Sequence, residues 1–286
     1  MSDLDRRLNA FRPDLADARL RGRVEAARFV TGRPARVAVP VLDVRSAPRA
    51  DAGLDTQLLD GDTVAVFDEA EGFAWVQAAR DSYVGYVAAA ALAAGAGSPT
   101  HIVAVPRTFA YREADMKTRA TTCFSLGSRI RTVRQAETRG TLYALLETGE
   151  ALVAAHLRPV DEEVADFVSV AELLDRTPYL WGGASAFGID CSGLVQLSLR
   201  MAGRPAPRDT DMQAQAIGAL LSIGEDLAGL RRGDLVFWKG HVAIMLDAEN
   251  IIHANGHTMS VAREPLRQAV DRIAWLYGRP TGFRRP

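Results

Sequence analysis

The sequence predicts a multidomain protein with two small β-barrels followed by an α+β domain. Between residues 35 and 160, short alternating apolar runs are separated by turn residues, and this rhythm occurs twice, which is typical of small barrels. After residue 160, apolar residues recur at helical spacing, a cysteine precedes a second helical pattern, and strand-like runs follow. A chain of 286 residues is long enough for two or three compact domains.

The first segment is polar and rich in arginine, and its apolar residues between Leu15 and Val30 are spaced as on one amphipathic helical piece. We interpret this segment as a packing arm or a linker. The predicted organisation is an N-terminal arm or linker, a first barrel, a degenerate second barrel that serves as a binding module or as a spacer, and a catalytic domain, over residues 1–34, 35–97, 98–160 and 161–286.

Composition and charge narrow the class of protein. A hydrophobic content of 48% and a charged content of 24% are ordinary for a globular protein. A net charge of -1 provides no field for nucleic acid or an anionic membrane, so we expect neither partner, and no motif indicates an obligate protein partner. No apolar core follows the start, and a disulfide between Cys123 and Cys191 would consume the candidate nucleophile, so we expect a cytoplasmic protein.

Cys191 stands between a glycine-rich loop and a helical pattern. A thiol in the first turn of a helix faces unpaired backbone N–H groups and the positive end of the helix dipole, which favour the thiolate. The neighbouring Asp190 acts in the opposite direction, because an adjacent carboxylate raises a thiol pKa. On position alone, a buried structural cysteine explains the pattern equally well.

Two histidines follow on predicted neighbouring strands. His241 opens the second of two short strands separated by a turn at Lys239-Gly240, and His253 lies in the next strand. One imidazole can accept the thiol proton while the other fixes its orientation. Together with Cys191, these residues form a candidate set of nucleophile, base and orienting residue. A mixed zinc site built from the same three residues is the alternative, although we expect no metal and no cofactor.

Five motifs in this order resemble the NlpC/P60 family of papain-like cysteine peptidases, which cut peptide bonds in bacterial cell-wall stems. The resemblance covers residues 161–286 and implies that Cys191 is the nucleophile, His241 the base and His253 the orienting residue, with Tyr179 at the oxyanion site. It rests on Tyr179-x-Trp181-Gly182-Gly183, Asp190-Cys191-Ser192-Gly193, Arg232-Gly233-Asp234-Leu235-Val236-Phe237, Gly240-His241-Val242 and Ile252-His253-Ala254.

The first barrel resembles a bacterial SH3-type barrel through Leu42-x-Val44-Arg45, Gly61-Asp62, Trp75 and Gly85-Tyr86-Val87. The second barrel is a weaker, degenerate repeat of the same type. The implied fold is therefore two small SH3-like β-barrels followed by an α+β papain-like NlpC/P60 catalytic domain.

Arg208-Asp209 resembles a pair found in one subgroup of the family, in which the aspartate binds the free amino group of a stem peptide. In that subgroup a tyrosine of the first barrel closes the substrate pocket. Tyr83 is the candidate here, Tyr86 is second, and Asp55 is a candidate acidic partner. The other explanation for Asp209 is a cap on a helix that starts near Thr210. Asp190 and Ser192 complete the predicted substrate-binding set.

These residues predict a cysteine peptidase that hydrolyses the γ-D-glutamyl-L-diamino acid bond of cell-wall stem peptides, where the diamino acid is diaminopimelate or lysine. The expected substrate is a free peptide with an N-terminal L-Ala, in peptidoglycan turnover or recycling. Two alternatives remain. One is a papain-like amidase or acyltransferase that uses the same thiol, and the other is a catalytically dead protein that binds wall peptides.

Overall fold

The protein is described by a computed structural model that covers residues 4–95 and 97–286. The chain divides into two compact units that meet in sequence between Glu162 and Glu163. Most of the first unit consists of β-strands, whereas the second combines a sheet with four α-helices.

A seven-stranded antiparallel sheet with strand order β5-β4-β8-β7-β6-β3-β9 forms the first part of unit one. In β4, Leu42 and Val44 are buried while the alternate residues are more exposed, as expected of a strand with one core-facing side. Glu71 and Gly72 both have positive φ, the backbone of a tight hairpin turn between β6 and β7. The strands are β3 (Arg33–Val37), β4 (Val41–Arg45), β5 (Leu54–Leu59), β6 (Thr63–Ala70), β7 (Phe73–Ala78), β8 (Val84–Ala88) and, after the 3₁₀ helix η2 (Ala89–Ala91), β9 (Leu92–Ala93).

The N-terminal segment is not the amphipathic helix that its apolar spacing predicted. Leu15 instead packs with Phe67 and Trp75 of the seven-stranded sheet, and the Arg12 guanidinium lies 4.4 Å from the Trp75 ring centroid. Tertiary packing therefore outweighs the local periodicity. The segment contains two strands that pair in parallel and one 3₁₀ helix: β1 (Leu15–Asp17), η1 (Ala18–Leu20) and β2 (Arg28–Val30).

A second group of strands follows, in a three-stranded sheet (β13-β10-β17) and a five-stranded sheet (β12-β11-β16-β15-β14). Strands of both sheets contribute to one apolar core of Val103, Ala110, Phe124, Ile130 and Leu152. The elements are β10 (His101–Val103), β11 (Arg107–Tyr111), β12 (Ala120–Ser125), β13 (Arg129–Ile130), β14 (Thr132–Thr138), β15 (Thr141–Leu146), β16 (Ala151–Val153), η3 (Ala154–His156) and β17 (Leu157–Pro159).

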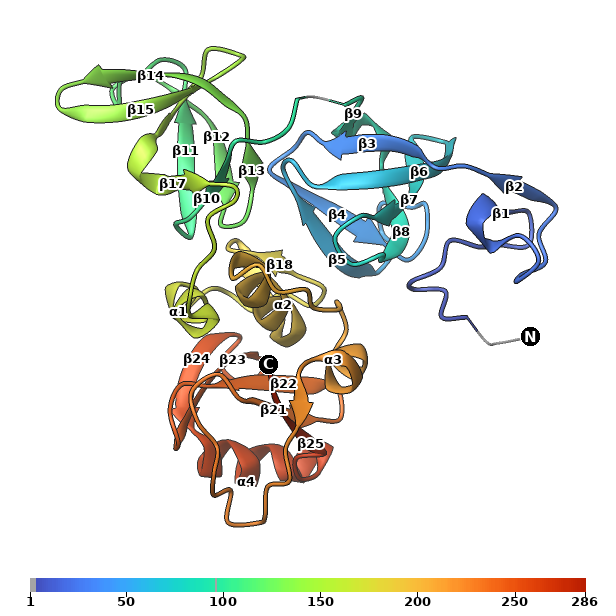
Figure 1. Cartoon of the computed structure of the whole chain (residues 1–286), viewed down its shortest axis with the longest axis vertical. Coiled ribbons are helices and arrows are strands. Elements are labelled where there is room, and N and C mark those ends of the chain that lie inside the picture. Colours follow the sequence, from blue (N-terminus) through green and yellow to red (C-terminus); the bar gives the residue numbers. More distant parts are fainter. Residues whose placement is uncertain (1–3, 96) are drawn as a thin grey trace. The chain divides into compact units, whose positions relative to one another are not determined.

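Unit two is built around a six-stranded sheet with order β20-β25-β21-β22-β23-β24. Helices α2 and α4 lie on opposite sides of this sheet (Figure 1). The elements are α1 (Phe167–Leu173), β18 (Ala184–Ser185), β19 (Gly188–Ile189), α2 (Cys191–Met201), α3 (Thr210–Ala216), β20 (Ala219–Leu220), β21 (Leu235–Trp238), β22 (His241–Met245), β23 (Asn250–Asn255), β24 (Ser260–Pro265), α4 (Leu266–Tyr277) and β25 (Gly282–Arg285).

Sequence patterns explain how the two helices pack. In α2, every residue from Cys191 to Leu199 is buried, so this helix has no solvent-facing side until its last turn, and it contacts β22 and β23. In α4, the buried residues follow helical spacing and pack on β21 to β23, and Gly278 with φ +80° ends the helix. No helix within the described part of the chain combines the length and apolar character that a membrane span needs.

Candidate active site

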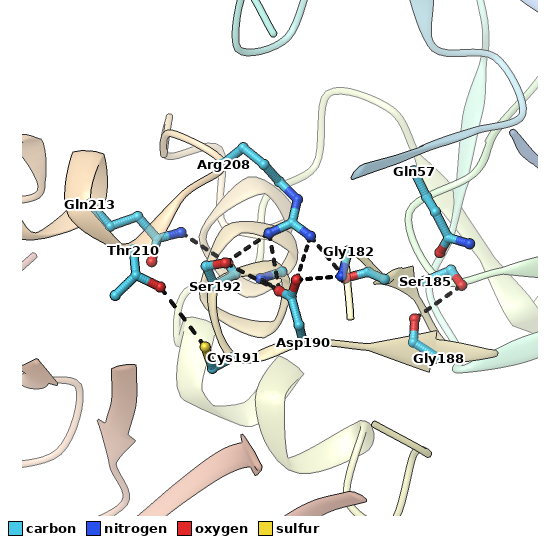
Figure 2. Close-up of polar contacts among 12 residues, drawn as sticks. Gln57, Gly182, Ser185, Gly188, Asp190, Cys191, Ser192, Arg208, Thr210 and Gln213 are labelled. Atoms are coloured by element: carbon cyan, nitrogen blue, oxygen red, sulfur yellow. Dashed lines mark hydrogen bonds and ion pairs between the residues drawn. The ribbon is translucent and has the colours of Figure 1, made fainter. Parts of the chain in front are cut away.

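Asp190 organises the start of α2. Its carboxylate accepts hydrogen bonds from the backbone N–H of Gly193 (2.7 Å), as a helix N-cap does, and of Gly182 (3.0 Å). The Ser192 hydroxyl donates to the same group at 3.1 Å. The Arg208 guanidinium binds both oxygens, at 3.0 and 2.6 Å (Figure 2). This carboxylate therefore has fixed donors on both oxygens.

Arg208 is only 1% exposed, and it also donates to the Ser192 hydroxyl at 2.7 Å and to the Gly183 carbonyl at 3.3 Å. Sequence reasoning placed Asp190, Ser192 and Arg208 among the residues that contact substrate. In the structure all three are buried and direct their polar groups at one another, and their contact with substrate stays a prediction. They hold the loop and the first turn of α2 together.

Two glycines of the sequence motifs are explained by close backbone contacts. A Cβ atom on Gly193 would lie 2.4 Å from the carbonyl oxygen of Gly183, and a Cβ on Gly183 would lie 2.5 Å from the carbonyl oxygen of Gly188. No side chain fits at these distances, so the glycine-rich loop can approach the helix start only with glycine at both positions. This approach fixes Cys191 as the first residue of α2.

The Cys191 side chain is 6% exposed, and its sulfur lies 3.9 Å from the Thr210 hydroxyl oxygen (Figure 2) and accepts a hydrogen bond from the backbone N–H of Val242. Burial, followed by the charge of Asp190, raises the pKa of the thiol to about 11. Burial therefore favours the protonated thiol in this structure, in the direction opposite to the one expected from the helix terminus.

His241 directly precedes Val242 in β22, so it is the chain neighbour of the residue whose backbone N–H contacts the sulfur. Nε2 of His241 is 2.8 Å from Nδ1 of His253, and the two ring centroids are 5.0 Å apart. Burial, followed by the charges of His253 and Arg272, lowers the pKa of His241 to about 3. At neutral pH the thiol and this imidazole thus both rest uncharged. The structure pairs the two histidines that the sequence proposed as base and orienting residue, and it places the proposed nucleophile in contact with the backbone N–H that follows the first of them.

Two residues that contact Cys191 or His253 were not identified from the sequence. Thr210 is one, and Glu264 is the other, with its Oε1 2.7 Å from Nε2 of His253. Arg272 of α4 forms an ion pair with Glu264. The alternation of β24 could have placed Glu264 on the same side as Ala262, but only the strand register brings it to His253.

The contacts of His253 bear on the zinc alternative. Both ring nitrogens of His253 lie within hydrogen-bond distance of protein groups, one of His241 and the other of Glu264. Neither nitrogen is left to bind a metal together with Cys191. Across residues 4–95 and 97–286, no group of three or more His, Cys, Asp or Glu side chains is arranged to hold a metal ion.

The remaining predicted residues have different positions. Tyr179 is half-buried, and its pKa is raised by burial and then by the charge of the nearby Cys191. Asp209 occupies the N-cap position of α3, where its carbonyl accepts from the Gln213 N–H, but its side chain makes no capping hydrogen bond. Tyr83 lies buried in unit one, so its predicted approach to Cys191 stays a prediction.

Two sequence families match this chain. Residues 176–274 match the NlpC/P60 family, and residues 44–92 match the bacterial dipeptidyl-peptidase SH3 domain. The probable endopeptidase NlpC of Escherichia coli is 35% identical over 132 residues, which are 41% of this chain and 79% of that protein. The chain therefore belongs to the NlpC/P60 family, with an SH3 domain before the family domain.

Two further relatives extend this result. The gamma-D-glutamyl-L-lysine dipeptidyl-peptidase of Bacillus cereus is 32% identical over 109 residues, and the match spans only 31% of that protein's length. A crystal structure of an NlpC/P60 family protein from Bacillus cereus superposes with a TM-score of 0.72 at 21% identity, covering 88% of this chain and 99% of that one. At this identity the similarity shows a shared fold.

Proposed function

We propose that this chain is a cysteine peptidase that hydrolyses the γ-D-glutamyl-L-diamino acid bond of bacterial cell-wall stem peptides. The observation that carries the proposal is the Cys191 sulfur at the start of α2, in contact with the backbone N–H that follows His241, together with the hydrogen-bonded pair of His241 and His253. The name of the Bacillus cereus relative supports this bond as the target and lysine as one diamino acid. Diaminopimelate is the other.

The reaction proceeds through a thioester. The thiol proton of Cys191 passes to His241, and the sulfur attacks the carbonyl carbon of the γ-linked D-glutamyl residue. Backbone N–H groups at the start of α2, together with Tyr179, stabilise the negative oxygen. The carbon–nitrogen bond then breaks while His241 returns its proton to the leaving amine. Finally, His241 deprotonates a water molecule that hydrolyses the thioester and restores the thiol.

The uncharged resting state suits this sequence of steps. A His241 imidazole with a pKa near 3 has a free lone pair at neutral pH, but it is a weak base in this structure. The nucleophile is then produced only when the proton moves within the site. Since a buried ion pair costs desolvation energy, binding of a polar peptide would favour the transfer by supplying new partners for the charges.

Selection of a free N-terminal amine is the finer part of the proposal. Asp209 directly precedes Thr210, whose hydroxyl is 3.9 Å from the sulfur, so its carboxylate stands one residue from a group that contacts the nucleophile. A carboxylate there pairs with the ammonium of L-Ala. Tyr83 of the SH3 domain would close the pocket, and Asp55 would supply a second acid. This preference fits recycling of freed peptides in the cytoplasm.

The test uses L-Ala-γ-D-Glu-diaminopimelate and its N-acetylated form, with products identified by mass spectrometry. We expect cleavage of the free peptide, loss of cleavage in Cys191→Ala, and full activity in the matched thiol variant Cys123→Ser. Full activity of Cys191→Ala would refute the mechanism. Equal cleavage of both peptides by the wild type would refute amine selection, which Asp209→Asn should abolish. Adding a competing amine separates hydrolysis from acyl transfer.

A further inference from the structure

Glu264 reaches His253 because of the register between two strands. In the antiparallel pair β23 and β24, His253 lies opposite Ala262 and Ile251 lies opposite Glu264. Glu264 is therefore a diagonal neighbour of His253 on the same side of the sheet. Its Oε1 atom accepts from Nε2 of His253 at 2.7 Å, and Arg272 from α4 donates to the same oxygen.

The charge on Glu264 decides which atoms donate. Burial alone would raise the pKa of Glu264, but the hydrogen bond from His253 and the charges of His253 and Arg272 outweigh it and hold this pKa below its ordinary value. Glu264 is therefore a carboxylate at neutral pH. An ionised carboxylate has no hydrogen to donate, so Nε2 of His253 must carry one.

The chain of hydrogen bonds extends from Glu264 through His253 to His241. In a neutral His253 with a proton on Nε2, Nδ1 carries only a lone pair and accepts. Its partner at 2.8 Å, Nε2 of His241, must then donate. In a neutral His241 with a proton on Nε2, the free lone pair is on Nδ1. One carboxylate thus sets the tautomer of both imidazoles.

We infer that Glu264, held by Arg272, is a positioning residue that fixes the proton arrangement of the His241–His253 pair, so that His241 keeps Nδ1 unprotonated for the Cys191 thiol. The inference deepens the proposed function and rests on it for the role of His241 as base. Glu264 acts through His253 and touches neither the thiol nor the substrate in this reaction.

Arg272 has a distinct part in this arrangement. A carboxylate with no cation beside it favours a protonated imidazole. A protonated His253 would donate from both nitrogens, and His241 would have to accept through Nε2, which places its own proton on Nδ1. Arg272 balances part of the charge of Glu264, while the carboxylate still accepts from Nε2 of His253. The charged or titratable groups gathered here are His241 from β22, Glu264 from β24, Arg272 from α4 and Cys191 from α2.

The test measures the thiol itself and needs no knowledge of the substrate. The full chain carries Cys123→Ser, so that Cys191 is its single thiol, and its alkylation by iodoacetamide is followed from pH 5 to pH 9. We expect Glu264→Ala to slow alkylation at neutral pH by about 10- to 100-fold, the size of loss found when the hydrogen-bond partner of a metal-bound histidine is removed. Nitrogen-15 spectra should show both histidines protonated at Nε2 in the parent and mixed tautomers in the variant.

Glu264→Gln is the conservative variant and guards against misfolding. Its amide oxygen can still accept from His253 and Arg272, so its alkylation rate should lie closer to the parent than to Glu264→Ala. Arg263→Ala is the matched control, because this residue neighbours Glu264 on β24 but pairs with Glu172 and Asp175. It should alkylate at the parent rate. Melting temperatures confirm that each variant is folded.

The outcomes separate this inference from the proposed function. An unchanged alkylation profile and unchanged tautomers in Glu264→Ala would overturn the positioning role, whatever the peptidase assay gives. If folded Glu264→Gln is alkylated as slowly as Glu264→Ala, the hydrogen bond accepted by the side-chain oxygen does not explain the slower alkylation. The inference then also fails. If the stem peptide is not cleaved but Glu264→Ala slows alkylation, the proposed substrate is wrong and the positioning role stands.

Discussion

Two hydrogen-bond networks of the catalytic domain each contain one arginine and one carboxylate, and they differ in the other groups that the carboxylate contacts. In the loop network, Asp190 binds Arg208 and receives further hydrogen bonds from backbone N–H groups and the Ser192 hydroxyl. In the sheet network, Glu264 binds Arg272 and accepts from an imidazole. The ion pairs are similar, but their surroundings are not.

The difference lies in the third partner of each carboxylate. Backbone N–H groups and a serine hydroxyl near Asp190 do not change protonation state at ordinary pH, so the loop network can only fix geometry. The imidazoles near Glu264 can gain, lose or relocate protons, so the sheet network can change the state of the base. An arginine–carboxylate pair beside a nucleophile is thus a scaffold or a proton-controlling device according to what else it contacts.

His241→Gln should separate the two networks most strongly. This variant removes the base and leaves the loop network intact, so kcat on the stem peptide should fall by about 10²- to 10⁴-fold. The melting temperature should change little. His257→Gln is the control, because His257 is exposed on the turn after β23. Retained activity in the His241 variant would contradict its role as base.

Arg208→Met should have the next largest effect, on stability. Removing one partner of a buried ion pair costs about 3–5 kcal/mol, because the remaining charge on Asp190 is left buried. Urea unfolding measures the loss. The same change at Arg263, whose ion pairs are exposed, should cost about 0–1 kcal/mol. Equal losses for the two variants would show that the loop network does not stabilise the fold as described.

The pH dependence of stability tests the sheet network. The pKa of His241 falls from 6.5 to about 3 on folding, so between these values the unfolded chain binds a proton that the folded chain does not. Stability from this group is present above pH 6.5 and is lost as the pH falls toward 3. His241→Gln should therefore lose less unfolding free energy than the wild type between pH 7 and pH 4.5. If the wild type and the variant lose the same unfolding free energy over this range, His241 is more hydrated than the structure indicates.

Thr210→Val should have the smallest effect. The hydroxyl is 3.9 Å from the sulfur and lowers the pKa of the thiol slightly against the effect of burial. Alkylation of Cys191 in the Cys123→Ser background should slow about twofold, which corresponds to about 0.5 kcal/mol for a weak hydrogen bond. A loss as large as that in Glu264→Ala would mean that Thr210 belongs to the proton-controlling group.

Much of this site could be predicted from the sequence. A cysteine between a glycine-rich loop and a helical pattern, and histidines on two consecutive strand patterns, are local signals, and the structure has a helix that begins at Cys191 and a hydrogen bond between the two histidines. Glu264 has no such signal, since its contact depends on strand register. The burial of Arg208 was not predicted, because arginine is usually exposed. The predicted N-terminal helix was wrong because apolar residues at helical spacing, such as Leu15, pack from a strand onto Phe67 and Trp75.

Peroxide oxidises thiolates far more readily than thiols. Because the Cys191 sulfur is protonated at rest and nearly closed off from solvent, an oxidant meets little reactive sulfur until a peptide enters and the proton moves. Protection of this sulfur from oxidation is therefore built into the resting site, through burial and the retained proton.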